Sequence, residues 1–262
     1  MQSIDKHRLA VAVIAAAALT ACASRYEPPA EKGGLPQLRL QNSVIAPGQG
    51  GELIAASVLE PADVLLSSGA TLQSLGIQLA TLAPVSHALV YLGDGLVAEA
   101  VGEGVRTRRI EAVLDEEAMV VAFRAPDITP AQAQRLRDWS LSQVGVQYNT
   151  VGVMLTAPFV LSRRLCELPL VPGAVRDACV RGFATVQLGA SRDDRFFCSQ
   201  FMLKAYRQAG APLSSADPRW VTPADLLHMR EGDVATLTAS HPLQYVGHLK
   251  VLPPLAERVS AP

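Results

Sequence analysis

The sequence predicts an α+β fold in which helices pack on one face of a mostly antiparallel sheet, and three observations lead to this prediction. The first is a β-hairpin, because two apolar segments with strand-like alternation, Ser86–Leu92 and Leu96–Val101, flank the turn residues Gly93-Asp94-Gly95. The second is a further set of short apolar strands: one ends at 63–66, and two others lie near 105–110 and at 119–124. The third is helical periodicity, with apolar residues at three- and four-residue steps, over 70–82, 130–144 and 198–209.

The ends of these elements follow from local chemistry. In the first helix the apolar face is formed by leucines, and Pro84 ends the helix; the leucines are Leu72, Leu75, Leu79 and Leu82. The second helix begins after Thr129 as N-cap, with Pro130 in the first turn. The third stops at Gly210. Two C-terminal segments, 234–237 and 245–252, are expected to be edge strands that complete the sheet.

The N-terminus has the pattern of an export signal. Basic residues precede the apolar run 9–19, which is too short to span a bilayer. Leu19-Thr20-Ala21-Cys22 resembles the lipobox of bacterial lipoproteins, which implies lipidation of Cys22. Ala23 at the next position implies sorting to the periplasmic face of the outer membrane in a Gram-negative cell. An ordinary signal peptide or an uncleaved anchor is the alternative reading of residues 1–22.

Composition divides the remaining chain and excludes some partners. Residues 23–51 are rich in Pro and Gly and are expected to form a flexible tether. Residues 52–252 then form one domain, and 253–262 are a C-terminal tail. The chain of 262 residues has a net charge of −1 and no basic stripe, so nucleic acid is not expected as a partner. No CxxC or HxxxH spacing occurs, so neither a metal nor another cofactor is expected.

The cysteines single out one candidate nucleophile. Four are present, and if Cys22 carries lipid, Cys166 and Cys179 can close a short loop as a disulfide. Cys198 is then a free thiol in the first turn of a helix, where the helix dipole favours the nucleophilic thiolate. A buried cysteine that only packs is the alternative.

His87 and Glu99 are polar residues inside the predicted hairpin, and the loop length decides whether they meet. A two-residue Asp94-Gly95 turn pairs Val90 with Glu99 and sends His87 and Glu99 to opposite faces. A three-residue loop pairs Leu89 with Glu99 and makes Glu99 the diagonal neighbour of His87 on one face. The glycines on both sides of Asp94 suit the three-residue loop. A carboxylate can then orient an imidazole that pairs with Cys198.

At these residues the chain resembles a known family. The blocks 63–66, 77–81, 86–91, 98–102 and 197–200 resemble the circularly permuted NlpC/p60-type cysteine hydrolases of the YiiX/YebB kind, which are papain-like enzymes in which the histidine precedes the cysteine. The resemblance implies that Cys198 is the nucleophile, His87 the general base and Glu99 the group that orients His87. Tyr148 matches a family Gly-x-x-Tyr motif and is expected near the cysteine.

The resemblance also frames the expectations for substrate. Ser86 and Ser199, together with Tyr148, are expected to contact it. Residues 151–192 form an insertion relative to compact relatives, and the sequence leaves three interpretations open. The insertion is a lid or wall of the substrate groove, a structural insert closed by Cys166–Cys179, or an amphipathic contact with the membrane.

The sequence therefore favours a lipid-anchored periplasmic cysteine hydrolase, an amidase or peptidase that acts through an acyl-enzyme. Peptidoglycan peptides are the expected substrate for a domain on a short lipid tether. Two alternatives remain at this point: a lipid-directed thiol acyltransferase or esterase, and a non-catalytic lipoprotein that binds envelope partners.

Overall fold

The computed structural model describes residues 23–29, 35–45, 51–69, 71–148, 158–168, 171–188 and 196–251. The export signal, Cys22 and the C-terminal tail lie outside these ranges, as do 151–157, 169–170 and 189–192 of the insertion. Within the described part of the chain, no helix is both long and apolar enough to cross a membrane.

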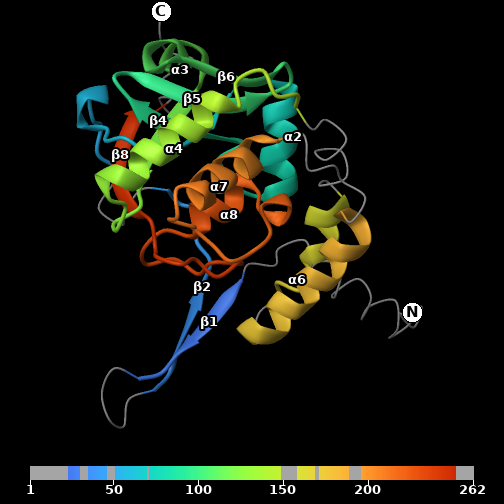
Figure 1. The fold of residues 1–262 in the computed structure, drawn as a ribbon. Helices are drawn as coiled ribbons and strands as arrows, with labels where there is room; N and C mark the ends of the chain where they lie inside the picture. Colours follow the sequence, from blue (N-terminus) through green and yellow to red (C-terminus); the bar gives the residue numbers. More distant parts are fainter. Residues whose placement is uncertain are drawn as a thin grey trace, which may run out of the picture.

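A six-stranded sheet forms the centre of the fold (Figure 1). Its strand order is β6-β5-β4-β3-β7-β8, and every neighbouring pair is antiparallel. The strands are β3 (Val64–Ser68), β4 (His87–Gly93), β5 (Leu96–Val101), β6 (Gly104–Arg109), β7 (Met119–Arg124) and β8 (Gln244–Lys250). The α+β fold and the mostly antiparallel sheet expected from the sequence are therefore confirmed.

Helices cover the sheet on both faces, but unequally. On one face the large core contains side chains of α4 (Pro130–Ser142), α7 (Cys198–Gln208) and α8 (Pro223–His228). On the other face, α3 (Ile110–Glu116) contributes two side chains to a smaller cluster with the strands. The sequence did not predict α3, so the expectation that helices lie on one face alone holds only for the longer helices. The helix α2 (Leu72–Thr81) connects β3 to β4.

The helix α7 is anchored in the core along its length. Phe201, Met202 and Tyr206 are fully buried, and the Tyr206 hydroxyl donates a hydrogen bond to the Ala62 carbonyl. The ring of Trp139 on α4 stacks on Phe201 with centroids 5.7 Å apart. Burial of several large side chains on one helix stabilises its position strongly, at about 2 kcal/mol for each. The N-terminus of α7 is therefore held in a fixed place relative to β4.

The insertion packs as part of the structure. Its described part contains a short helix over 158–163 and α6 (Gly173–Leu188), joined by the Cys166–Cys179 disulfide that the sequence suggested. Buried Arg163 donates to both carboxylate oxygens of Asp225 in α8, at 2.9 and 2.5 Å. The same carboxylate also accepts a hydrogen bond from the Thr222 backbone N–H at 2.7 Å, as part of the capping box at the start of α8. Of the three interpretations of the insertion, the structural one fits these contacts.

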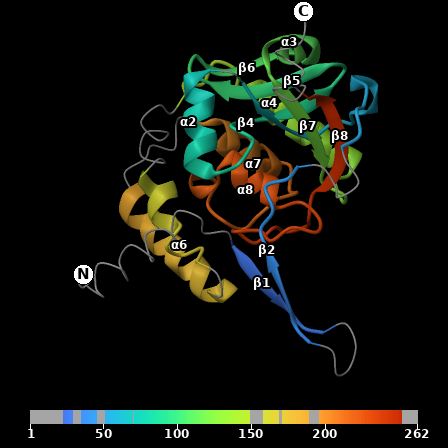
Figure 2. The ribbon, with the colours of Figure 1, turned by 180° about the vertical axis from the view of Figure 1, so that it is seen from behind.

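The N-terminal region differs from the expected flexible tether. The strands β1 (Ser24–Glu27) and β2 (Gln37–Leu40) form a separate two-stranded sheet, which extends away from the rest of the fold (Figures 1 and 2). Composition suggested a tether because Pro and Gly are frequent here, but the strand residues alternate between polar and apolar. The predicted edge strand at 234–237 is also wrong, since these residues form bends and irregular chain, whereas β8 confirms the strand predicted at 245–252.

Candidate active site

The hairpin register brings His87 and Glu99 together. Val90 lies opposite Ala98 and Tyr91 opposite Val97, which is the register expected for the three-residue loop. The turn itself is the two-residue Asp94-Gly95, because Gly93 pairs with Leu96, and a bulge between Tyr91 and Gly93 produces the register beyond it. The loop residues Gly93, Asp94 and Gly95 all have positive φ angles, of 91°, 54° and 70°. Such angles suit glycine and are tolerated by aspartate. As a result, His87 Nε2 lies 2.8 Å from Glu99 Oε2.

Two arginines on the neighbouring strand hold the other oxygen of Glu99. In β6, Arg106 lies directly opposite Glu99, and its Nε donates to Glu99 Oε1 at 2.8 Å. Arg108 Nη1 reaches the same oxygen at 3.5 Å. The Glu99 side chain is only 3% exposed, so these contacts supply the partners that water would otherwise provide. Sequence analysis missed both arginines, although their alternation in β6 puts them on one face of the strand.

The thiol of Cys198 completes this arrangement. Cys198 is the first residue of α7, and its thiol lies in the same pocket as the His87 ring, close enough to affect the pKa of the imidazole. It is buried, at 7% exposure, and is a free thiol in the described part of the chain. Because His87 Nε2 faces Glu99, the other ring nitrogen is the one available to the thiol.

The electrostatics of the three groups favour a charged pair. Burial by itself lowers the pKa of His87, but the hydrogen bonds and negative charges of Cys198 and Glu99 raise that pKa to about 10. Burial also raises the pKa of Glu99, and the contacts with His87 and Arg106 outweigh it and lower the pKa to about 2. At neutral pH, His87 is therefore an imidazolium that donates to an ionised Glu99.

These residues line a pocket of about 260 Å³. Tyr148 and Ser86, both expected from the sequence, lie in its wall. Burial and the nearby charge of Cys198 raise the pKa of Tyr148, which keeps its hydroxyl protonated. The Ser86 hydroxyl pairs with that of Ser74 at 2.6 Å.

Ser199, the other serine expected to contact the substrate, lies away from the pocket. Ser199 does not line the pocket: its side chain is fully buried and its hydroxyl donates to the Val221 carbonyl at 2.6 Å. Successive residues of a helix point about 100° apart, so a neighbour of the pocket-lining Cys198 need not share its direction. Ser199 ties the start of α7 to the chain before α8.

Glu117, a residue that sequence analysis did not single out, adds a further charge to the pocket. One carboxylate oxygen of Glu117 is buried without a hydrogen-bond partner. Burial raises the pKa of this carboxyl group. Together with Arg106, Arg108 and Glu116, it adds charge to a pocket wall that also contains the apolar residues Ile77, Ala100 and Val101.

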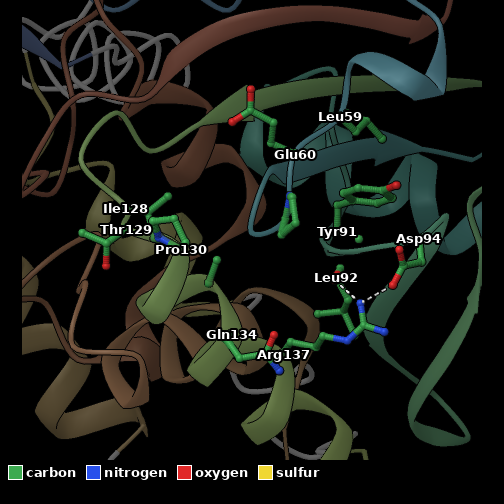
Figure 3. Close-up of a pocket in the computed structure, with 13 residues that line it drawn as sticks. Leu59, Glu60, Tyr91, Leu92, Asp94, Ile128, Thr129, Pro130, Gln134 and Arg137 are labelled. Carbon is green, nitrogen blue, oxygen red and sulfur yellow. Dashed lines mark hydrogen bonds and ion pairs between the residues drawn. The ribbon is translucent and has the colours of Figure 1, made fainter.

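A larger pocket, of about 530 Å³, lies elsewhere and contains none of these residues (Figure 3). The guanidinium group of Arg137 in this pocket already has protein partners, because it donates to the Leu92 carbonyl at 2.6 Å and pairs with Asp94 at 3.1 Å. No thiol or imidazole lines it. Among the described residues, no group of three or more His, Cys, Asp or Glu side chains is placed to hold a metal ion. The smaller pocket at Cys198 is therefore the candidate active site.

Comparisons with known proteins found a lipoprotein relative among curated proteins. No protein-family model matches the chain. The chain is 38% identical over 200 residues to YaeF of Escherichia coli (strain K12), described as a probable lipoprotein peptidase, and the match covers 75% of this chain and 73% of YaeF. Among solved structures, the metalloprotein yiiX from Escherichia coli O157:H7 is similar, with a TM-score of 0.44 and 19% identity; the match covers 74% of this chain and 98% of that chain.

Proposed function

Because the chain belongs to the YiiX/YebB-like lipoprotein family, together with the lipoprotein peptidase YaeF, we propose that it is a cysteine peptidase or amidase whose nucleophile is Cys198. The observation that carries the proposal is the contact of Cys198 with His87, whose second nitrogen lies 2.8 Å from Glu99. A thiol, an imidazole and a carboxylate in this order form the usual arrangement of a cysteine hydrolase. The order of β4 before α7 in the chain supports our proposal that the fold is a permuted papain-like one.

In the proposed reaction, the Cys198 thiolate attacks the carbonyl carbon of an amide bond and forms a tetrahedral intermediate. Backbone N–H groups in the first turn of α7 have no intrahelical partner and are suited to stabilise the oxyanion. The His87 imidazolium then donates its proton to the departing amine, which leaves a thioester at Cys198. Water, deprotonated by His87, attacks the thioester and releases the carboxylic acid and the thiol. Glu99 keeps the ring oriented throughout, and Tyr148 contacts the substrate in the pocket.

The charged groups in the pocket wall favour a peptide rather than a lipid ester as substrate. Glu99, Glu117 and Arg106 lie beside the apolar residues of the wall, and acyl chains do not compensate the desolvation of charged groups. The presence of Cys198, His87 and Glu99 in one pocket favours a hydrolase over a purely binding protein.

The proposed location follows from Cys22. We assign it as the lipidated N-terminus of the mature protein, on the periplasmic face of the outer membrane. A domain held there is close to the cell wall, so we propose that the amide bonds are those of peptidoglycan peptides.

Alkylation of the protein without reductant tests the thiolate. Iodoacetamide labelling is followed by mass spectrometry between pH 4 and 9, and the disulfide protects Cys166 and Cys179. We expect fast labelling of Cys198 well below pH 8 and its loss in His87→Ala. Hydrolysis of muropeptides should be abolished in Cys198→Ala, while Glu111→Gln, at an exposed position outside the pocket, should match the wild type. Turnover in Cys198→Ala would disprove the mechanism.

A further inference from the structure

The hairpin of β1 and β2 has two chemically different faces. Tyr26 lies opposite Leu38, and Ser24 lies opposite Leu40, so these four side chains share one face. The opposite face carries the polar residues Arg25, Glu27, Gln37 and Arg39. On it, Arg39 pairs with Glu27 at 3.2 Å. One face is thus apolar and the other charged.

Within the described part of the chain, the three apolar side chains of this face remain largely exposed, whereas Ser24 at its base is buried. Tyr26, Leu38 and Leu40 are 63%, 45% and 55% exposed. None of them belongs to either buried cluster of the domain. Figures 1 and 2 show the hairpin extending away from the central sheet in opposite views. An isolated two-stranded sheet is marginally stable in water, so a surface that covers this face would stabilise it.

The base of the hairpin is fixed to the domain. The Gln41 backbone N–H donates to the Ala23 carbonyl at 2.8 Å, and its side chain donates to the Val234 carbonyl and the Thr236 hydroxyl, both at 3.0 Å. Arg230 Nη2 donates to the Val44 carbonyl at 2.8 Å. The hairpin is therefore a projecting arm whose orientation is set by contacts at its base.

The position of the arm in the sequence identifies its partner. Cys22 stands two residues before Ser24, and two extended residues span at most about 7 Å. Leu40 lies opposite Ser24, and Tyr26 and Leu38 are two strand positions further on, or about 7 Å more. Acyl chains on Cys22 would thus enter a bilayer within about 15 Å of all three apolar side chains.

We propose that the apolar face formed by Tyr26, Leu38 and Leu40 docks onto the lipid bilayer that holds the acyl chains of Cys22. The inference rests on the lipid anchor of the proposed function, but not on the peptidase reaction. Tyrosine is well suited to this position, because its ring enters the membrane interface while its hydroxyl stays hydrated. Arg25 and Arg39 remain on the solvent side. Docking fixes the orientation of the domain on the membrane, whereas the lipid alone only attaches it.

Fluorescence quenching in vesicles tests the docking. The full chain, lipidated in its host, is reconstituted into vesicles of phosphatidylethanolamine and phosphatidylglycerol with bromine on the acyl chains. Tyr26→Trp is compared with Glu27→Trp, its neighbour on the opposite face, after subtraction of the wild-type signal of Trp139 and Trp220. We expect quenching of Tyr26→Trp to exceed that of Glu27→Trp several-fold.

Equal quenching at both positions, or none, would overturn the proposal. Concentration-dependent dimerisation in detergent together with an unquenched Tyr26→Trp would assign the face to a second copy of the chain, and also overturn it. Mass spectrometry of the mature N-terminus distinguishes failure of the docking from failure of the lipid anchor. If Cys22 is acylated and Tyr26→Trp is not quenched, docking alone fails; if Cys22 carries no lipid, the anchor fails and docking with it. Cys198 alkylation reports independently on the peptidase.

Discussion

Replacement of Glu99 by Gln should destabilise the protein by about 3 kcal/mol near pH 6. Removal of one partner from a buried ion pair costs about 3–5 kcal/mol, because the other charge stays uncompensated. The lower end applies here, since the Gln oxygen still accepts one hydrogen bond and Arg106 is 38% exposed. For a domain of this size, about 3 kcal/mol corresponds to a fall in melting temperature of about 6–12 °C.

The loss should depend on pH in a defined way. The pKa of Glu99 falls from 4.5 to about 2 on folding, so its contribution is complete above pH 4.5 and is lost as pH falls towards 2. The pKa of His87 rises from 6.5 to about 10, so its contribution is complete below pH 6.5 and is lost as pH rises towards 10. The difference in unfolding free energy between wild type and variant should therefore be largest between about pH 4.5 and 6.5.

Urea unfolding of both proteins at pH 3, 5.5 and 9.5 measures this difference, and iodoacetamide labelling reports on the site. We expect slower labelling of Cys198 in the variant, because the His87 ring loses the carboxylate that orients it. Glu116→Gln is the matched control, since Glu116 also pairs with Arg108 but is 66% exposed. Its effect should be below about 1 kcal/mol. A Glu99→Gln variant that unfolds like the wild type at pH 5.5 would refute the electrostatic argument.

Three further variants test separate parts of the structure. Joint replacement of Cys166 and Cys179 by Ser should lower the unfolding free energy by about 3 kcal/mol through loop entropy, measured in urea against the oxidised wild type; an unchanged midpoint would contradict this. Ser199→Ala should lower it by about 1–2 kcal/mol, since the buried Val221 carbonyl loses its donor, and a changed KM without destabilisation would restore a substrate role. Glu117→Gln should raise the melting temperature at pH 8, because burial disfavours the charged carboxylate more than His87 and Arg108 favour it; a lower value would contradict this balance.

The sequence predicted the site residues that depend on local geometry. The contact of His87 with Glu99 follows from the loop, because Gly93 and Gly95 permit the positive φ angles that set the register. The start of α7 at Cys198 follows equally from its apolar periodicity. Residue chemistry allowed Cys198 to pair with His87, but only the family resemblance assigned the pair, since the approach of the two residues depends on packing between distant segments.

Other features depend on long-range contacts that no local pattern encodes. Glu117 enters the pocket because α3 ends beside the sheet, and α3 itself follows a strand without a turn signal. The side chain of Ser199 is directed by a carbonyl 22 residues away. The hairpin of β1 and β2 had a local signal, the alternation in 24–27 and 37–40, but the Pro and Gly between these strands obscured it.

The carboxylate of Asp225 joins two parts of the chain into one unfolding unit. Arg163 of the insertion binds both carboxylate oxygens, and the capping box of α8 uses one of them, Oδ2. Release of Arg163 would therefore leave a buried carboxylate without its cation. Local unfolding follows such cooperative units rather than sequence boundaries. Amide hydrogens of 158–163 and of α8 should then exchange with solvent at a common rate. The insertion would protect α8 from proteases, although neither segment lines the pocket at Cys198.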